Sequence, residues 1–148
     1  MISKNGFEII KKLEGYSALE YNSVSGKRTI GYGHRLNPDE RYICGLSEKK
    51  AEEILRRDLD LFETSLEASV KVPLREWQRD ALLSFIFDIG VYAFQRSTVL
   101  KELNDGNYNE VPSQMLRWVY VDGRFCSGLM RRRQTEAALF ENKKSAVL

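Results

Sequence analysis

The spacing of apolar residues constrains this chain most, because it is helical almost throughout and is interrupted by one short β-type segment. In the first 13 residues, apolar side chains recur every three or four positions, which predicts a helix capped by Ser3 and ended by Gly15. Between Tyr16 and His34 the pattern changes to two short β-type fragments, joined through Gly26. This segment predicts a small antiparallel hairpin.

Five further helices are predicted after the hairpin. The longest begins at Ser47 and continues to about Val70, so that roughly 22 residues span ~33 Å. The next, from Trp77 to Ile89, is apolar on almost every side, which is typical of the centre of a core. Shorter helices are expected to begin at Ser97, Asn109 and Ser127. The order predicts an α+β, mainly helical fold, with a small β-hairpin lobe joined by a long helix to a C-terminal helical lobe.

The length of 148 residues suits a single domain. We expect the β-containing lobe and its connecting helix to cover about residues 15–60, and the helical lobe about residues 1–14 and 71–148. Because clefts form most readily between lobes, a substrate is expected to bind there.

Composition indicates an ordinary globular protein, with 43% hydrophobic and 30% charged residues and a net charge of +2. The positive charge is uneven, because Arg131, Arg132 and Arg133 are consecutive. Such a run is typical of a solvated helix face, and the alternative is a site for an anionic partner. We expect no nucleic-acid partner, since no recognition motif accompanies the arginines.

The two cysteines, Cys44 and Cys126, match no metal-ligand spacing, and the chain has one histidine. We therefore expect free thiols and no metal or organic cofactor. No apolar stretch approaches the ~20 residues that cross a bilayer, so stable membrane insertion is not expected. The N-terminal residues also show no export signal.

The segment between the first helix and the end of the hairpin carries the most informative motif. It contains Glu14-Gly15, Tyr21, Gly26 and the run Thr29-Ile30-Gly31-Tyr32-Gly33-His34. This segment resembles the signature of the phage lysozymes, in register and without a gap. The similarity continues through residues 84–90, Trp118 and residues 128–140, so it covers nearly the whole chain.

The resemblance implies a lysozyme-like fold and a muramidase. Such an enzyme hydrolyses the β-1,4 bond between N-acetylmuramic acid and N-acetylglucosamine in peptidoglycan, by a single-displacement, inverting reaction. It would act as a monomer on glycan strands and would need no cofactor. The resemblance further implies synthesis in the host bacterial cytoplasm, release to the cell wall with help from a protein such as a holin, and host lysis.

Physical reasoning supports Glu14 as the catalytic acid. Cleavage of a glycosidic bond requires a carboxylic acid that is still protonated near neutral pH. A carboxylate in the last turn of a helix faces the negative end of the helix dipole, which disfavours ionisation, as does burial under an aromatic ring. By residue type alone Glu14 would be a solvated surface residue, but the surrounding motif favours the catalytic role.

The family carries a second catalytic carboxylate nine residues after the glutamate, and that position is Ser23 here. A serine holds a water but supplies no negative charge to an oxocarbenium-like transition state. Activity is therefore lost, or rescued by a neighbour such as Glu20, or sustained by Glu14 and a water held by Ser23 and Thr29. Glu20 is three residues away on a strand and should point to the opposite face. Retention of the remaining motif favours residual activity.

The resemblance also assigns roles to residues beyond the two carboxylate positions. Thr29 is the third catalytic residue, whose hydroxyl positions the water. Tyr32, Arg35, Phe87 and Ser97 are the expected substrate-binding residues. An aromatic face and a hydroxyl suit a sugar, although Phe87 could equally belong to the core.

His34, the only histidine, is either a general base or a structural partner for a carboxylate on the connecting helix, and we expect the structural role with Asp58 or Asp60. Trp118 is expected to pack in the core. Two rival functions stay open: a lysozyme-like module that binds glycan without turnover, and a nucleic-acid binder that uses Arg131 to Arg133.

Overall fold

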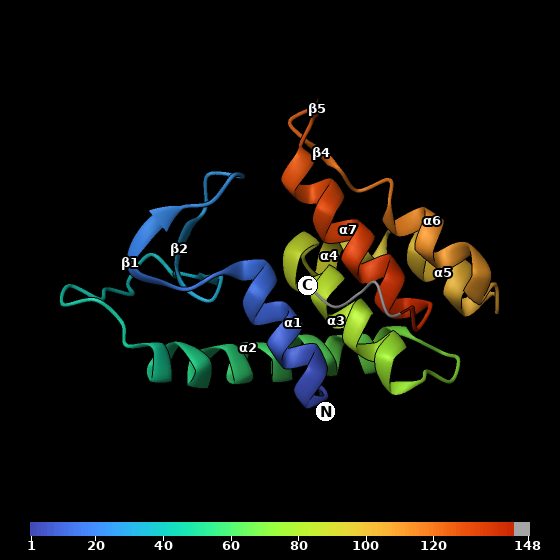
Figure 1. Cartoon of the computed structure of the whole chain (residues 1–148), viewed down its shortest axis with the longest axis horizontal. Coiled ribbons are helices and arrows are strands. Elements are labelled where there is room, and N and C mark those ends of the chain that lie inside the picture. The colour runs from blue at the N-terminus through green and yellow to red at the C-terminus, as the bar shows by residue number, and fades with distance from the viewer. Residues whose placement is uncertain (144–148) are drawn as a thin grey trace.

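The computed structural model describes residues 1–143 and has two lobes, one mainly helical and one with a small sheet (Figure 1). The β lobe is built from β1 (Ser17–Asn22), β2 (Arg28–Gly31) and β3 (His34–Arg35). The helices are α1 (Lys4–Glu14), α2 (Glu48–Ser69), α3 (Glu76–Ile89), α4 (Val91–Gln95), α5 (Thr98–Asn104), the 3-10 helix η1 (Tyr108–Glu110), α6 (Val111–Met115) and α7 (Ser127–Phe140). A second hairpin consists of β4 (Tyr120–Val121) and β5 (Arg124–Phe125). The predicted α+β, mainly helical class is confirmed.

The sheet of the β lobe has the order β1-β2-β3, with antiparallel pairing throughout. Tyr21 pairs with Thr29, and Gly26 lies in the connecting turn with a φ of 80°. A residue with a side chain rarely adopts this left-handed conformation, so the turn favours glycine. The predicted hairpin is therefore confirmed, and a short third strand extends it.

Helix α2 runs beneath both lobes and joins them (Figure 1). The Ser47 side chain caps it by accepting a hydrogen bond from the Lys50 N–H, as the sequence predicts. Two clusters of buried apolar residues each include side chains of α2. One surrounds α3 and includes Leu82 and Phe85, and the other joins Ile30 of the sheet to Leu55 of α2.

Helix α1 contributes to both clusters. Ile9 packs into the cluster around α3, whereas Phe7 and Ile10 pack into the cluster under the sheet. Ser3 caps the helix by accepting from the Gly6 N–H, and Gly15 ends it. Because the buried side of α1 packs against both clusters, its C-terminal residue is held between the lobes.

Three details of the C-terminal half differ from the sequence expectation. Asn109 does not cap a helix but lies within η1, and α6 begins at Val111 with Pro112 in its first turn. Ser127 is the first residue of α7 rather than its cap, and the capping residue Cys126 makes no side-chain cap bond. The helix α4 and the hairpin β4–β5 were not predicted, because both are too short to show a period. Residues 144–148 of the expected helical lobe lie outside the described residues.

Cys44 is exposed and Cys126 is partly buried, and both are free cysteines, as predicted. Among residues 1–143, no helix combines the length and the apolar character needed to cross a membrane.

Candidate active site

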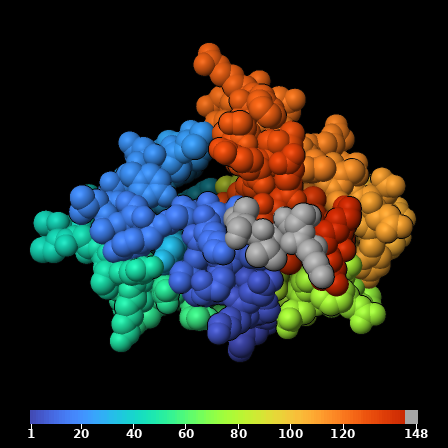
Figure 2. Space-filling view, in the orientation of Figure 1, coloured from blue at the N-terminus to red at the C-terminus, as the bar shows by residue number. Residues whose placement is uncertain are grey.

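A cleft of about 510 Å³ lies between the two lobes. In the space-filling view the surface is hollowed between the β1–β2 region and the C-terminal elements (Figure 2). The β lobe contributes Tyr21, Ser23, Val24, Ser25, Lys27, Thr29, Gly33 and Arg35 to its lining. The helical lobe contributes Glu14, Phe87, Asp88, Ile89, Trp118, Tyr120, Val121, Asp122, Leu129 and Arg133.

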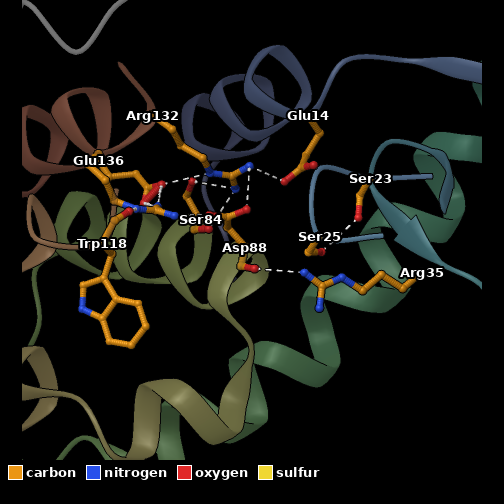
Figure 3. A network of polar contacts seen from close by, with 10 residues as sticks. Glu14, Ser23, Ser25, Arg35, Ser84, Asp88, Trp118, Arg132 and Glu136 are labelled. Atoms are coloured by element: carbon orange, nitrogen blue, oxygen red, sulfur yellow. Dashed lines mark hydrogen bonds and ion pairs between the residues drawn. The ribbon is translucent and has the colours of Figure 1, made fainter. Parts of the chain in front are cut away.

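Glu14 is the last residue of α1 and faces this cleft. Gly15 ends the helix with a φ of 70°, and its N–H donates to the Lys11 carbonyl. The Glu14 side chain is only 13% exposed, and its Oε1 accepts a hydrogen bond from Arg132 Nη1 at 2.5 Å (Figure 3). The sequence therefore placed Glu14 correctly at a helix end, but it gave no sign of the guanidinium beside it.

Arg132 belongs to a buried network of charges on α7 and α3. Its Nε donates to Glu136 Oε1 at 3.0 Å, and its Nη2 donates to the Ser84 carbonyl at 2.9 Å. In Figure 3 its guanidinium lies between Glu14 and Glu136. Burial by itself lowers the pKa of Arg132, but the charges of Glu14, Glu136 and Asp88 outweigh it and raise the pKa.

Arg133 completes the network from the neighbouring position. Its Nη1 donates to both oxygens of Glu136, at 2.6 and 2.8 Å, its Nε donates to the Trp118 carbonyl, and its Nη2 pairs with Asp88. Glu136 is fully buried, and burial raises the pKa of its carboxyl although Arg133 and Arg132 act in the opposite direction.

The prediction of a solvated arginine face is wrong for two of the three residues. Arg131 is exposed, but Arg132 is 7% and Arg133 is 0% exposed. Buried arginines require carboxylate partners, and here the partners come from α1, α3 and α7 itself. Glu136 lies within one helical turn of the run, but α1 and α3 are distant in sequence, so the run alone could not reveal the pairing with Glu14 and Asp88.

Gly33 lets the β lobe approach Glu14 closely. Its φ is 72°, and a Cβ at this position would lie 2.4 Å from Glu14 Oε2 and 3.0 Å from the Phe87 ring. Phe87 lines the cleft and packs edge-on against Phe62, with ring centroids 5.3 Å apart. Oε2 of Glu14 thus faces the cleft floor, while Oε1 is held by Arg132.

The opposite wall of the cleft presents hydroxyl groups. Ser23 Oγ lies 3.0 Å from Ser25 Oγ and accepts a hydrogen bond from the Lys27 N–H at 3.1 Å (Figure 3). Thr29 is buried, and its hydroxyl donates to the Lys27 carbonyl at 2.8 Å. Glu20 is paired with Arg28 and does not line the cleft, as its strand position predicts.

The four expected substrate-binding residues separate into two groups. Phe87 and Arg35 line the cleft, and Arg35 Nη2 donates to the Asp88 carbonyl at 3.0 Å, which connects the two lobes (Figure 3). Tyr32 is instead buried under the sheet, where its hydroxyl donates to Glu48 at 2.6 Å, and burial and this bond raise its pKa. Ser97 caps α5 and donates to the Phe94 carbonyl. The structure thus does not bring Tyr32 or Ser97 into the cleft.

His34 has the predicted structural role. Its Nδ1 lies 2.6 Å from Asp58 Oδ2 on α2, whereas Asp60 is not its partner. Its Nε2 lies 3.0 Å from Glu40 Oε2, a contact that sequence reasoning missed. The hydrogen bond with Asp58 raises the pKa of His34, burial opposes this effect, and Glu40 adds to it.

Several cleft residues were missing from the sequence prediction. Ser25 and Asp88 line the cleft beside the expected residues, and the β4–β5 hairpin brings in Tyr120. Trp118 packs edge-on against Phe85 in the core, as expected, and also lines the cleft. In the described part of the chain, no group of three or more His, Cys, Asp or Glu side chains is placed to hold a metal ion.

A carboxylate at a helix end, set in a cleft between a small sheet and a helical lobe, is the arrangement found in a glycoside hydrolase of the lysozyme type, and solved structures of this type share the fold. The family model for phage lysozyme matches residues 11–136. The chain therefore belongs to the phage lysozyme family. It is a muramidase, and the substrate of this family is peptidoglycan.

Individual relatives agree with this assignment over 95% of the chain. An endolysin of Acyrthosiphon pisum secondary endosymbiont phage 1 is 38% identical over 145 residues, which are 95% of this chain and 98% of the relative. The solved muramidase domain of SpmX from Asticaccaulis excentricus has a TM-score of 0.84 and 35% identity, covering 95% of this chain and 97% of the domain. A crystal structure of P22 lysozyme has a TM-score of 0.81 and 36% identity, covering 95% and 98%.

Proposed function

We propose that this chain hydrolyses the β-1,4 bond between N-acetylmuramic acid and N-acetylglucosamine in bacterial peptidoglycan, with Glu14 as the proton donor. The observation that carries the proposal is the position of Glu14. One carboxyl oxygen is fixed by Arg132 at 2.5 Å, and the other faces the cleft floor at Gly33. A carboxyl group held in this way presents one oxygen to a glycosidic bond that lies across the cleft.

In the proposed reaction, Glu14 donates its proton to the glycosidic oxygen as the bond to the anomeric carbon breaks. A water then attacks that carbon from the side of the hairpin, so the configuration is inverted. The water keeps one proton as the new hydroxyl group and loses the other to solvent, and Glu14 takes up a proton from solvent for the next cycle. Ser23 and Thr29 are the groups proposed to position this water, because both line the hairpin wall. Ser25, 3.0 Å from Ser23, orients the Ser23 hydroxyl.

Ser23 stands where we expect the second carboxylate of the family. A hydroxyl pair orients a water but leaves the positive charge of the transition state without a facing negative charge. We therefore propose that the enzyme is active with a reduced rate.

The decisive experiment is release of soluble muropeptides from purified peptidoglycan. We expect release by the unaltered chain and a loss of about a hundredfold to ten-thousandfold in Glu14→Gln, because general acid catalysis is removed. Glu20→Gln is the matched control, since Glu20 lies outside the cleft, and its rate should be unchanged. Equal rates in the unaltered chain and Glu14→Gln would contradict the proposal.

A lysozyme-like module without turnover is the rival function. It predicts co-sedimentation with peptidoglycan and no release by the unaltered chain. The nucleic-acid alternative has lost its basis, because Arg132 and Arg133 are buried in ion pairs.

We further infer that the chain acts as a monomeric single domain and lyses the host after release from the bacterial cytoplasm with help from a holin. The endolysin names of its relatives support this route. Light scattering after size exclusion would test the monomer, and lysis of host cells with and without a coexpressed holin would test the route.

A further inference from the structure

The β4–β5 hairpin projects from the helical lobe (Figure 1), and Tyr120, Val121 and Asp122 of this hairpin line the cleft. Its turn residues Asp122 and Gly123 have φ angles of 49° and 76°. Two successive positive φ values are the conformation of a two-residue hairpin turn whose twist matches that of the paired strands. The hairpin is therefore a well-defined protrusion, although each strand has only two residues.

Two aromatic side chains of this hairpin are exposed side by side. Tyr120 is 63% and Phe125 is 57% exposed, and the two residues pair directly across the strands. Their ring centroids lie 6.4 Å apart at an interplanar angle of 74°. Single exposed aromatics are ordinary, but an adjacent pair leaves a continuous apolar surface in water. Because this surface contributes little to the core, it indicates contact with a ligand.

The base of the hairpin is anchored to the network that holds Glu14. The Trp118 carbonyl accepts from Arg133 Nε at 2.9 Å, and the Cys126 N–H donates to the Val119 carbonyl at 2.8 Å. Arg133 and Arg132 in turn share Glu136. The aromatic pair is thus held at a fixed place relative to the catalytic acid.

The hairpin is also continuous with the cleft. Tyr120, Val121 and Asp122 line the same cavity as Glu14, with Trp118 at the start of the hairpin. In Figure 2 the segment around residue 120 rises beside the hollow. A chain-like ligand that leaves the catalytic part of the cleft on this side therefore passes over the aromatic pair.

We propose that Tyr120 and Phe125 form a distal glycan-binding platform, which holds a sugar ring of the strand outside the catalytic part of the cleft. The C–H faces of a sugar ring pack against aromatic rings, and the neighbouring Asp122 carboxylate accepts hydrogen bonds from hydroxyl groups. A glycan is a better occupant than a bilayer, because Tyr120 and Asp122 line the same cleft as Glu14, so the platform is continuous with the site proposed for the glycan strand. The platform rests on the proposed peptidoglycan substrate.

The test compares long and short ligands in the Glu14→Gln background, so that no substrate is consumed. We would measure binding of peptide-free peptidoglycan glycan strands and of a single tetrasaccharide to Tyr120→Ala and Phe125→Ala. Affinity for long strands should fall about tenfold in both variants, and affinity for the tetrasaccharide should stay the same in Phe125→Ala, because Phe125 does not line the cleft. Tyr120→Phe should bind like its parent, because it retains the ring.

Tyr92→Ala is the matched control, because Tyr92 is 73% exposed on α4 and does not line the cleft. It should leave both affinities unchanged. Since binding is measured without turnover, a failure of hydrolysis alone leaves this test intact. Unchanged affinity of Tyr120→Ala and Phe125→Ala for long strands would overturn the platform, as would an equal loss for both ligand lengths in Phe125→Ala. The platform would also be overturned if Tyr120→Ala and Phe125→Ala kept their glycan binding but lost binding to vesicles of anionic phospholipid.

Discussion

The two walls of the cleft are held in different ways. On the helical side, Glu14 is fixed by Arg132, which also pairs with the fully buried Glu136, so this wall is a set of buried charges. On the hairpin side, Ser23 and Ser25 are neutral, and a backbone N–H from four residues away holds Ser23. The position of the acid is therefore coupled to the core of the molecule. The position of Ser23, which we propose to hold the attacking water, depends on local contacts that can change without unfolding the protein.

The largest effect should come from Glu136→Gln. Loss of this charge leaves Arg132 and Arg133 with too few partners in the interior, so the free energy of unfolding should fall by about 3 to 5 kcal/mol. Urea denaturation followed by circular dichroism would measure the change. The exposed Lys50–Glu53 pair is the control, and Glu53→Gln should have almost no effect. Similar stability of both variants would refute the claim that the helical wall depends on buried charge.

A comparison of Gly33→Ala with Gly106→Ala should distinguish the effect of backbone strain from the effect of displacing the Glu14 carboxyl group. The added Cβ meets Glu14 Oε2, so muropeptide release should fall about a hundredfold, and stability by about 1–2 kcal/mol. Gly106→Ala has a similar φ of 82° but no atom within 4 Å of its Cβ. It should lose similar stability and keep full activity. Equal loss of activity in both variants would argue against a tight contact at Glu14.

Ser23→Asp should raise muropeptide release about tenfold, because a carboxylate on the hairpin wall would face the positive charge of the transition state. Its stability should hardly change, since the Ser23 side chain is held by local contacts. Ser25→Asp adds the same charge at the neighbouring hydroxyl and should give a smaller gain. An equal gain in muropeptide release for both variants would show that the exact position of the carboxylate is unimportant. No gain in either variant would contradict the role proposed for the hairpin wall.

The smallest effect should be a pH dependence from His34. Its pKa is raised above the ordinary value of 6.5, so the stability it contributes is fully present below about pH 6.5. That contribution is lost as the pH rises through the higher pKa of the folded state. Between pH 6 and pH 8, the unfolding free energy should therefore fall more in the unaltered chain than in His34→Gln. Parallel pH profiles of the two proteins would exclude this contribution.

Much of the fold was predictable from the sequence, because the signals are local. Ser3, Ser47 and Ser97 cap helices through hydrogen bonds to residues three positions ahead. The hairpin β4–β5 was missed, although its Asp122-Gly123 dipeptide is a known turn signal. Strands of two residues are too short to show alternation, so only the turn could have indicated it.

The site was predictable only in part, because some of its contacts join residues that are distant in sequence. The motif placed Glu14, Ser23 and Thr29 on one cleft, yet the partner of Glu14 lies 118 residues away at Arg132. Charge patterning along the chain reports the presence of arginines but not their depth. Ser97 was assigned to the cleft by resemblance, while the short-range cap that its position also favours is what the structure contains.

The separation of Glu14 from Arg132 also bears on how the enzyme is made. Glu14, the last residue of α1, is translated before α7, which carries Arg132. Until α7 packs against α3, Glu14 has no guanidinium partner, and the cleft lacks the lining that α7 supplies through Leu129 and Arg133. Truncation before α7 would therefore leave Glu14 without Arg132, and we expect fragments that lack this helix to release no muropeptides.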